Sequence, residues 1–303
     1  MAGAADVTPS VSVVVTAFNQ ELFVRAAVES ALAQTYEPIE VIVVNDGSTD
    51  GTVQALDDLR DRIRLINTEN AGVAEARNTG VDAARGDLVA GLDGDDVWLR
   101  TKLARQVASY ESDETVGLVH CGIAVVDQWL RPIEERLVGV DGTHVAERML
   151  IGQDGALHPI GSTLLVERGL LREIDPYDPR LPPSEDWDMA YRLSRRSTVG
   201  FVPEPLVLYR QHATNAHRDV TRVERGMTIA FEKAFDDPDE AIQRLRRPAY
   251  GWLHLMLAGS AWEAGDRRRL LRHAMAAVRA QPSVALRFLG YPWRRLRRAF
   301  RRG

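Results

Sequence analysis

Short apolar runs alternate with amphipathic stretches over the first 126 residues of the chain. Residues 11–15 (VSVVV) and 39–44 (IEVIVV) are dominated by Val and Ile, which is typical of buried β-strands. Between these runs, apolar residues recur every three or four positions from Val24 to Ala31, the spacing of one face of a helix. The same alternation predicts further strands at 63–66, 87–92 and 117–126, and further helices at 52–60, 73–84 and 99–110.

Strands that alternate with helices of this length pair in parallel through crossover helices. The apolar runs are continuous rather than interspersed with polar residues, so we expect both faces of the sheet to be covered. The pattern therefore predicts an α/β fold with a Rossmann-like, doubly wound and mostly parallel sheet.

Beyond the last of these strands the alternation weakens. A strand is expected at 162–166. A helix is expected at 187–194, following the start of the acidic sequence SEDWD. Residues 200–209 are strand-like, although Pro203 and Pro205 interrupt them.

The C-terminal third of the chain has the periodicity of helices. Gly265 and Asp266 form a turn between two apolar helical stretches, so an αα-hairpin is expected there. The two apolar faces consist of Trp252, Leu255, Met256 and Gly259, and of Leu271, Ala274, Met275 and Val278. The expected organisation is a domain at residues 1–218, with halves at about 10–126 and 127–218, followed by a helical extension at 219–303.

Charge is distributed unevenly along a chain of otherwise ordinary composition. Hydrophobic residues make up 45% and charged residues 27%, which excludes global disorder. Residues 267–303 contain 12 arginines and no Asp, Glu or Lys, and removing these charges from the net −5 leaves −17 for residues 1–266. The sequence ends in WRRLRRAFRR before its final glycine, where Trp293, Leu296 and Phe300 fall at helical spacing. A basic amphipathic tail of this kind predicts contact with an anionic membrane surface, and the alternative is a solvated helix or a disordered cationic end. The acidic body argues against nucleic acid.

Cysteine content and hydropathy predict where the protein works. Cys121 is the only cysteine, which excludes an intramolecular disulfide and a multi-cysteine metal site and fits a reducing cytoplasm. We expect Cys121 to be a small core residue. The first ten residues lack the pattern of a secretory signal, and no apolar run reaches the roughly 20 residues that a membrane-spanning helix needs. A cytoplasmic location is expected, with peripheral contact to the inner face of the membrane through the tail.

Acidic residues follow two of the expected strands. Asp46 (VNDGSTDGT) ends the strand at 39–44, and Asp93, Asp95 and Asp96 (LDGDD) follow the strand at 87–92. NDG alone is a common turn, and LDGDD alone could be a solvated loop that caps a helix. Ligands of open α/β sheets bind beyond the carboxyl ends of the strands, where both motifs fall. Carboxylates crowded at one edge repel one another unless a cation lies between them, and Mg²⁺ or Mn²⁺ suits oxygen ligands.

Five segments in order resemble the inverting family-two glycosyltransferases, which have the GT-A fold. The resemblance covers about Ser10 to His212, although Asn45 and Gly94 depart from the commonest pattern and residues 127–184 match only loosely. The segments are VSVVVTAFN, VIVVNDGSTD, NAGVAEARNTG, GDLVAGLDGDD and PSEDWDMAYRL.

The resemblance implies a nucleotide-sugar site in the first half of the domain and an acceptor site in the second. It places Asp46 at the nucleotide base, Arg77 at the phosphates and Asp95 at the ribose. It implies a divalent metal, Mn²⁺ or Mg²⁺, held by Asp96 and by His212, although His212 could equally be an ordinary loop histidine. The nucleotide-sugar residues implied in this way are Thr16, Ala17, Phe18, Asp46, Arg77, Asn78 and Asp95.

The resemblance also assigns the general base to Asp186. The alternative is that Asp186 and its neighbour Glu185 are first-turn carboxylates that favour a helix N-terminus. Glu185 and Asp93 are expected to support the site. Trp187 could pack beneath the acceptor or could be a plain core residue.

These roles imply an inverting sugar transfer from a nucleotide-diphosphate sugar to a hydroxyl acceptor. By resemblance the donor is UDP-linked and the pathway is polysaccharide, cell-envelope or glycolipid synthesis. Two alternatives remain: a non-catalytic binding or scaffold protein that keeps the fold, and a sugar-1-phosphate nucleotidylyltransferase. The second is disfavoured because TAFNQELF lacks a glycine-rich basic loop.

Overall fold

A computed structural model of the protein describes residues 8–153, 161–212, 215 and 219–284. The chain divides into two compact units. The first contains residues 1–146 and 154–216, and the second contains residues 147–153 and 217–303. The basic tail at 285–303 lies outside the described residues, so the expectation for it stays a prediction.

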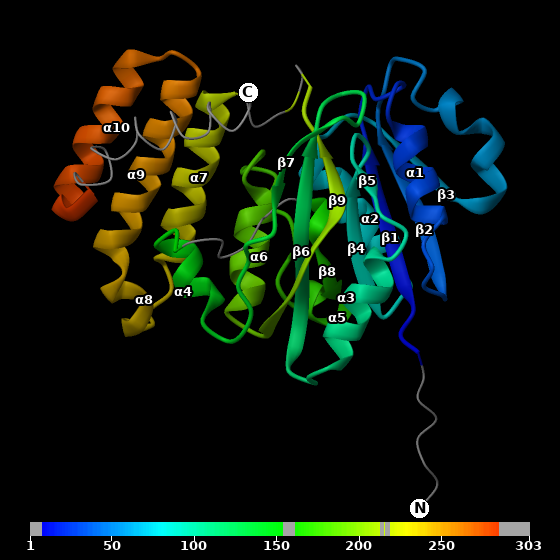
Figure 1. Cartoon of the computed structure of the whole chain (residues 1–303), viewed down its shortest axis with the longest axis horizontal. Helices are drawn as coiled ribbons and strands as arrows, with labels where there is room; N and C mark the ends of the chain where they lie inside the picture. The colour runs from blue at the N-terminus through cyan, green and yellow to red at the C-terminus, as the bar shows by residue number, and fades with distance from the viewer. Residues whose placement is uncertain (1–7, 154–160, 213–214, 216–218, 285–303) are drawn as a thin grey trace, which may run out of the picture. The chain divides into compact units, whose positions relative to one another are not determined.

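The first unit is built on a nine-stranded sheet with the order β3-β2-β1-β4-β8-β6-β9-β5, and β7 pairs with β6 (Figure 1). Strands β3, β2, β1 and β4 pair in parallel, and β6 pairs in parallel with β9. Strand β8 is antiparallel to both β4 and β6. The strands are β1 (Val11–Ala17), β2 (Ile39–Asp46), β3 (Arg64–Thr68), β4 (Leu88–Asp93), β5 (Val97–Trp98), β6 (Val116–Val126), β7 (Pro132–Arg136), β8 (Leu165–Glu167) and β9 (Thr198–Arg210).

Helices cover both faces of this sheet, which confirms the doubly wound α/β fold. On strand β1, Val11, Val13 and Val15 belong to the core cluster that contains α1 and α3. Val14 points the other way, toward Gly80 of α2. All of these positions are buried, because strand side chains alternate between two covered faces. The helices of this unit are α1 (Val24–Leu32), η1 (Gln54–Arg62), α2 (Val73–Ala83), α3 (Lys102–Glu111), α4 (Val145–Leu150), η2 (Gly161–Thr163), α5 (Arg168–Glu173) and α6 (Glu185–Ser194), and α4 continues into the second unit.

Two local expectations are corrected. The helix expected at 52–60 is a 3₁₀ helix, η1. Strand β9 runs unbroken through Pro203 and Pro205. The β6–β9 register shifts around Gly122, where Pro205 pairs, so the ladder accommodates the prolines at an irregularity.

The second unit is helical. Asp266 caps α10 by accepting a hydrogen bond from the Arg269 amide (3.0 Å), and Gly265 turns with a φ of +75°. The αα-hairpin expected at Gly265–Asp266 is therefore confirmed. No helix among the residues that the structure describes is long and apolar enough to cross a membrane. The helices of this unit are α7 (Val220–Ala234), α8 (Glu240–Arg244), α9 (Arg246–Glu263), α10 (Arg267–Ala280) and η4 (Pro282–Val284).

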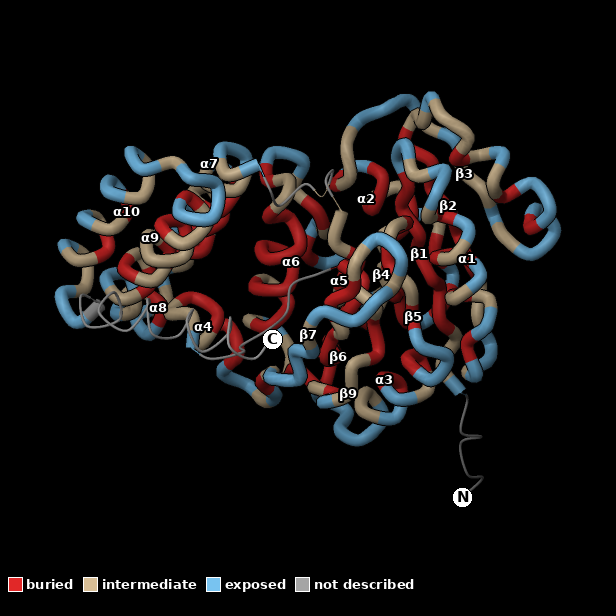
Figure 2. Tube along the Cα trace, turned by 45° about the horizontal axis from the view of Figure 1, so that its top comes forward, coloured by how far each residue is buried: buried red, intermediate tan, exposed pale blue. Residues whose placement is uncertain are grey.

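The two apolar stripes named from the sequence are not the faces that the helices of this hairpin bury. Helix α10 buries His273 and Ala277, whereas Leu271 and Met275 are 63% and 55% exposed. Figure 2 shows buried and exposed stretches alternating along this helix. Helix α9 buries Leu253, Leu257 and Ala261 rather than the stripe that begins at Trp252. Periodicity locates an apolar stripe on a helix but does not determine the direction in which the stripe points.

Candidate active site

The first part of the site is the edge at which β1, β2 and β4 end. Thr16 and Ala17 close β1 and are buried, whereas Phe18 just beyond them is 47% exposed. The Gly94 amide donates a hydrogen bond to the Thr16 carbonyl (2.9 Å), which ties the LDGDD loop to the end of β1. A Cβ at Gly94 would lie 2.9 Å from that carbonyl oxygen, so this contact requires glycine.

Asp46 organises the start of helix α2 from the end of β2. Its carboxylate accepts hydrogen bonds from the amides of Ala71 (2.8 Å) and Gly72 (2.9 Å), and only 3% of the residue is exposed. Gly72 has a φ of +95°, a left-handed conformation that glycine adopts without strain. Asp46 thus fixes the loop that leads into α2, and its contact with a nucleotide base remains a prediction.

The centre of the site is a guanidinium surrounded by three carboxylates. Arg77 Nη1 lies 2.5 Å from Glu185 Oε1 and 2.7 Å from Asp186 Oδ1. Arg77 Nη2 lies 2.6 Å from Asp93 Oδ1. We call these four residues the Arg77 cluster. The structure therefore brings together residues from α2, the end of β4 and the start of α6, and it uses Arg77 to hold carboxylates.

Asp186 has an unusual electrostatic environment within this cluster. Its second oxygen accepts a hydrogen bond from the Gly161 amide (3.0 Å). Burial raises the pKa of Asp186 to about 8, because desolvation and the nearby carboxylates of Glu185 and Asp93 outweigh the opposing effect of Arg77. A raised pKa makes this carboxylate a stronger base once it is ionised. Glu185 is 3% exposed, and its Oε2 atom is buried without a hydrogen-bond partner.

Asp95 and Asp96 are adjacent in sequence but lie in different surroundings. Asp96 is 1% exposed and accepts hydrogen bonds from the Ser162 hydroxyl (2.6 Å) and the Arg210 amide (2.9 Å). Burial, together with Asp95 and Asp93, raises the pKa of Asp96 well above its usual range. Asp95 Oδ2 instead lies 2.8 Å from His212 Nε2. The geometry thus pairs His212 with Asp95 and commits Asp96 to hydrogen bonds within the protein.

A metal site here would need ligands beyond these side chains. Within the described ranges, no three His, Cys, Asp or Glu side chains converge to form one. Asp95 and His212 nevertheless bring one carboxylate oxygen and one imidazole nitrogen within contact of each other. This pair fits a divalent cation that takes its remaining ligands from substrate phosphates and water, as Mg²⁺ commonly does.

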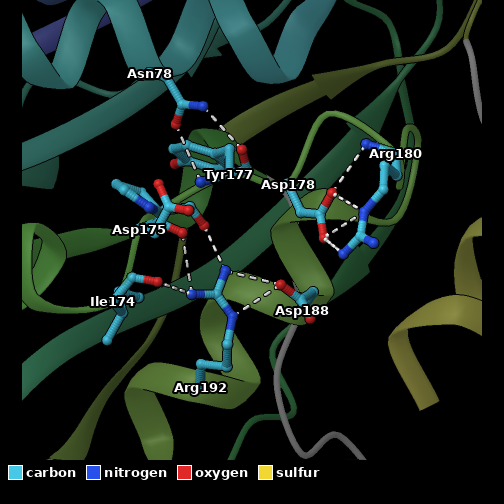
Figure 3. A network of polar contacts seen from close by, with 9 residues as sticks. Asn78, Ile174, Asp175, Tyr177, Asp178, Arg180, Asp188 and Arg192 are labelled. Atoms are coloured by element: carbon cyan, nitrogen blue, oxygen red, sulfur yellow. Dashed lines mark hydrogen bonds and ion pairs between the residues drawn. The ribbon is translucent and has the colours of Figure 1, made fainter. Parts of the chain in front are cut away.

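Asn78 lies against the segment that precedes α6. Its amide donates to the Tyr177 carbonyl (2.8 Å) and accepts from the Tyr177 amide (3.0 Å), as Figure 3 shows. Both ends of the side chain therefore order the segment that precedes α6. The nucleotide contact expected of Asn78 stays a prediction.

Sequence reasoning missed the residues that fix this segment onto α6. Arg192 donates to the carbonyls of Ile174, Asp175 (3.1 Å) and Pro176 (2.6 Å), and it pairs with Asp188 (2.7 Å) (Figure 3). The spacing of Asp188 and Arg192, four residues apart on an expected helix, was the available signal. Ser162 and Arg210, which bind Asp96, had no comparable signal because their partners are distant in sequence.

Trp187 faces the interior of the domain. It is 6% exposed and stacks on Tyr191 with ring centroids 5.4 Å apart and an angle of 3° between the ring planes. This placement favours the core role over direct contact with an acceptor. Cys121 is likewise a fully buried residue of β6.

Comparison with known proteins identifies the family of the chain. The family model described as glycosyl transferase family 2 matches residues 12–174, which is more than half of the chain. An uncharacterized glycosyltransferase of Rickettsia prowazekii is 33% identical over 209 residues, covering 68% of this chain and 65% of the relative. One from Nostoc is 32% identical over 216 residues, covering 68% and 66%. The chain thus spans about two thirds of the length of the curated relatives it matches.

Solved structures share the fold. The Staphylococcus aureus protein TarS (residues 1–349), in complex with UDP-GlcNAc, has a TM-score of 0.64 at 16% identity, covering 89% of this chain and 81% of TarS. The mannosyltransferase PcManGT of Pyrobaculum calidifontis, in complex with GDP-Man and Mn²⁺, has a TM-score of 0.61 at 23% identity, covering 96% and 84%. These similarities establish the GT-A fold. Because the family model matches more than half of the chain, the chain belongs to glycosyl transferase family 2.

Proposed function

We propose that this protein transfers a sugar, with inversion, from a nucleotide-diphosphate sugar to a hydroxyl acceptor. The observation that carries the proposal is Asp186, a buried carboxylate held by Arg77 and the Gly161 amide. A carboxylate has about four lone-pair directions, so these two hydrogen bonds leave capacity to accept the proton of a hydroxyl. The membership of glycosyl transferase family 2 supports sugar transfer as the reaction.

Asp186 acts as the general base in this proposal. A sugar hydroxyl is a poor nucleophile until its proton is removed, and a positioned carboxylate removes it as the attack proceeds. The oxygen then bonds to the anomeric carbon while the bond from that carbon to the diphosphate breaks. A single displacement of this kind inverts the anomeric configuration. Arg77 acts as a positioning residue, because it fixes the orientation of Asp186 through a hydrogen bond of 2.7 Å.

Asp95 and His212 would hold a divalent cation, Mn²⁺ or Mg²⁺, at the donor side of the site. When bound, such an ion neutralises charge that develops on the departing diphosphate. We assign this role to Asp95 rather than Asp96, because both Asp96 oxygens accept short hydrogen bonds within the protein. The Mn²⁺ in the PcManGT structure is consistent with this choice of ion.

Thr16, Ala17, Phe18 and Asp46 form the edge that we propose for the nucleotide. A UDP-linked donor is favoured by the family resemblance, and the TarS structure contains UDP-GlcNAc. We propose that residues 1–218 form the catalytic domain and residues 219–303 an extension to it. Polysaccharide, cell-envelope or glycolipid synthesis in the cytoplasm is the proposed setting.

The test compares nucleotide binding with transfer in Asp186→Asn. We expect the variant to bind nucleoside diphosphate with Mn²⁺ as the unaltered protein does, measured by thermal shift. Release of nucleoside diphosphate from the matching nucleotide sugar should fall by about 10²- to 10⁴-fold, the usual contribution of a general base. Asp95→Asn should instead weaken the dependence of nucleotide binding and of transfer on Mn²⁺.

Asp82→Asn is the matched control, because Asp82 is an exposed carboxylate on α2. It should leave both measurements unchanged. A fully active Asp186→Asn protein would remove the base from the mechanism. An unaltered protein that binds nucleotide sugars but releases no diphosphate would favour the non-catalytic alternative.

A further inference from the structure

The outer face of α10 carries exposed apolar side chains among positive charges. Leu271 and Met275 lie one turn apart and are 63% and 55% exposed. Four exposed arginines accompany them on the helix, and α10 contains no acidic residue. We call this surface the α10 outer face; its members are Leu271, Met275, Arg267, Arg268, Arg272 and Arg279.

The opposite side of α10 explains why this face is left outside. His273 and Ala277 are the buried residues of the helix, and they point into the helical unit. At the edge of the α10 outer face, Arg272 pairs with Glu224 of α7 (2.6 Å), so part of its charge is compensated within the helical unit. The apolar stripe is therefore exposed by the packing of the helix.

We propose that the α10 outer face is a docking surface for an anionic lipid bilayer. A helix that lies in a membrane interface places apolar side chains at the boundary of the acyl chains and basic side chains at the headgroup phosphates. Leu271 and Met275 supply the first, and the surrounding arginines supply the second. Charge complementarity thus selects an anionic surface.

Other occupants fit this face less well. In a symmetric contact with a second copy the same patch meets itself, so arginines would face arginines. A nucleic acid would gain nothing from Leu271 and Met275, and the net charge of −17 over residues 1–266 would repel it. The residues after 284 add seven arginines and no acidic residue, so positive charge continues along the chain from this helix.

Vesicle flotation with the full-length protein tests the apolar part of the proposal. We compare Leu271→Ser/Met275→Ser with a control pair, Ile133→Ser/Leu137→Ser, whose side chains are exposed by 40% and 38% in the first unit. We expect the α10 pair to reduce binding to vesicles of phosphatidylcholine with phosphatidylglycerol by about tenfold or more, since each residue loses several apolar carbons. The control pair should bind like the unaltered protein.

The charge part has its own matched pair. Arg267→Gln/Arg268→Gln should reduce binding to the anionic vesicles by about thirtyfold, the effect expected for two basic side chains near such a surface. Arg60→Gln/Arg62→Gln, on exposed arginines of η1, should not. Phosphatidylcholine vesicles should bind every variant weakly.

A fluorescent label reports the contact directly. Cys121 is the only cysteine and is buried, so Met275→Cys provides a single accessible thiol. An environment-sensitive dye at this thiol should shift to the blue with anionic vesicles, and the same dye on Ile133→Cys should not. Binding that survives in both α10 pairs, with no shift at position 275, would overturn the proposal and leave the tail at 285–303 as the contact. If the α10 variants lost a dimer or lost binding to single-stranded RNA while their vesicle binding stayed unchanged, the result would overturn the proposal in favour of that partner.

Discussion

Arg77 has more negative charge around it than it can neutralise. Three carboxylates approach one guanidinium within 2.5–2.7 Å, and all four side chains are largely buried. Ionised carboxylates without matching positive charge are costly in such a place, so one of them retains a proton more readily than it would in water. The raised pKa of Asp186 expresses this excess, and it has a consequence for the dependence of the reaction on pH.

Activity should therefore rise with pH through a limb near pH 8. Asp186 must be ionised to accept a proton, and burial raises its pKa to about 8, so the active form accumulates only as pH rises through that value. The measurement is kcat against pH at saturating donor, acceptor and metal. A limb near pH 4, the ordinary range of a carboxyl group, would show that Asp186 is not held as the structure indicates.

Replacement of Arg77 should affect stability as well as catalysis. Arg77→Gln leaves three buried carboxylates without their cation, and loss of one partner of a buried ion pair costs about 3–5 kcal/mol. We expect a decrease of that size in the free energy of unfolding, measured with urea at pH 7. Because Arg77 opposes the rise in the pKa of Asp186, the activity limb of the remaining folded protein should move to higher pH.

Arg85→Gln removes an exposed arginine two residues after α2 and serves as the control. It should change neither the stability nor the pH limb. If Arg77→Gln kept full stability with an unshifted limb, Arg77 would have no positioning role.

Among the elements, helix α2 connects Asp46 at the end of β2 with the Arg77 cluster. Its start is fixed by the hydrogen bonds from Ala71 and Gly72 to Asp46, and one turn later it carries Arg77. It packs on β1 where Gly80 meets Val14. The position of the guanidinium thus depends on how closely the helix can approach the sheet.

Gly80→Ala should separate α2 from the sheet. A Cβ at this position would lie 2.1 Å from Val14 Cγ1, so the helix or the strand must move. Overpacking of this kind costs about 1–3 kcal/mol of unfolding free energy. Urea unfolding should show that loss, together with reduced kcat because Arg77 lies on the same helix.

Gly259→Ala is the matched change in α9, where nothing lies within 4 Å of the added Cβ. Alanine is the better helix former, so this variant should be as stable as the unaltered protein or more stable by up to about 1 kcal/mol. A Gly80→Ala protein that behaved in the same way would contradict the close packing of α2 on β1.

At the scale of the whole molecule, the sequence was most informative where interactions are local. Continuous apolar runs predicted the parallel strands because each run reflects burial of its own strand on both faces. The ends of β2 and β4 then placed Asp46 and the LDGDD loop at one edge. The direction of the α10 stripe was not predictable in this way, since it depends on which neighbour the helix packs against.

The contact partners of the site residues could not be predicted from the local sequence pattern either. Arg77 and Glu185 are 108 positions apart, and nothing in either segment indicates an ion pair between them. The resemblance placed Arg77 at phosphates, whereas the structure shows it bound to three carboxylates. A resemblance identifies the position of a residue in a motif but not the contacts of its side chain. The resemblance gave Asp95 and Asp96 different roles, but the contacts of Asp96 with Ser162 and Arg210 had no signal in the local sequence.

The Arg77 cluster limits how this protein could be recombined with its relatives. A chimera that took residues 127–218 from another member of the family would inherit that protein's acidic pair, while the arginine and Asp93 came from this chain. Only a segment whose charges match those of Arg77 and Asp93 would restore the charge balance of the Arg77 cluster. Exchange of residues 127–218 between such proteins should therefore succeed in compatible sets of four residues, and segments swapped without regard to that set should lose stability as Arg77→Gln does.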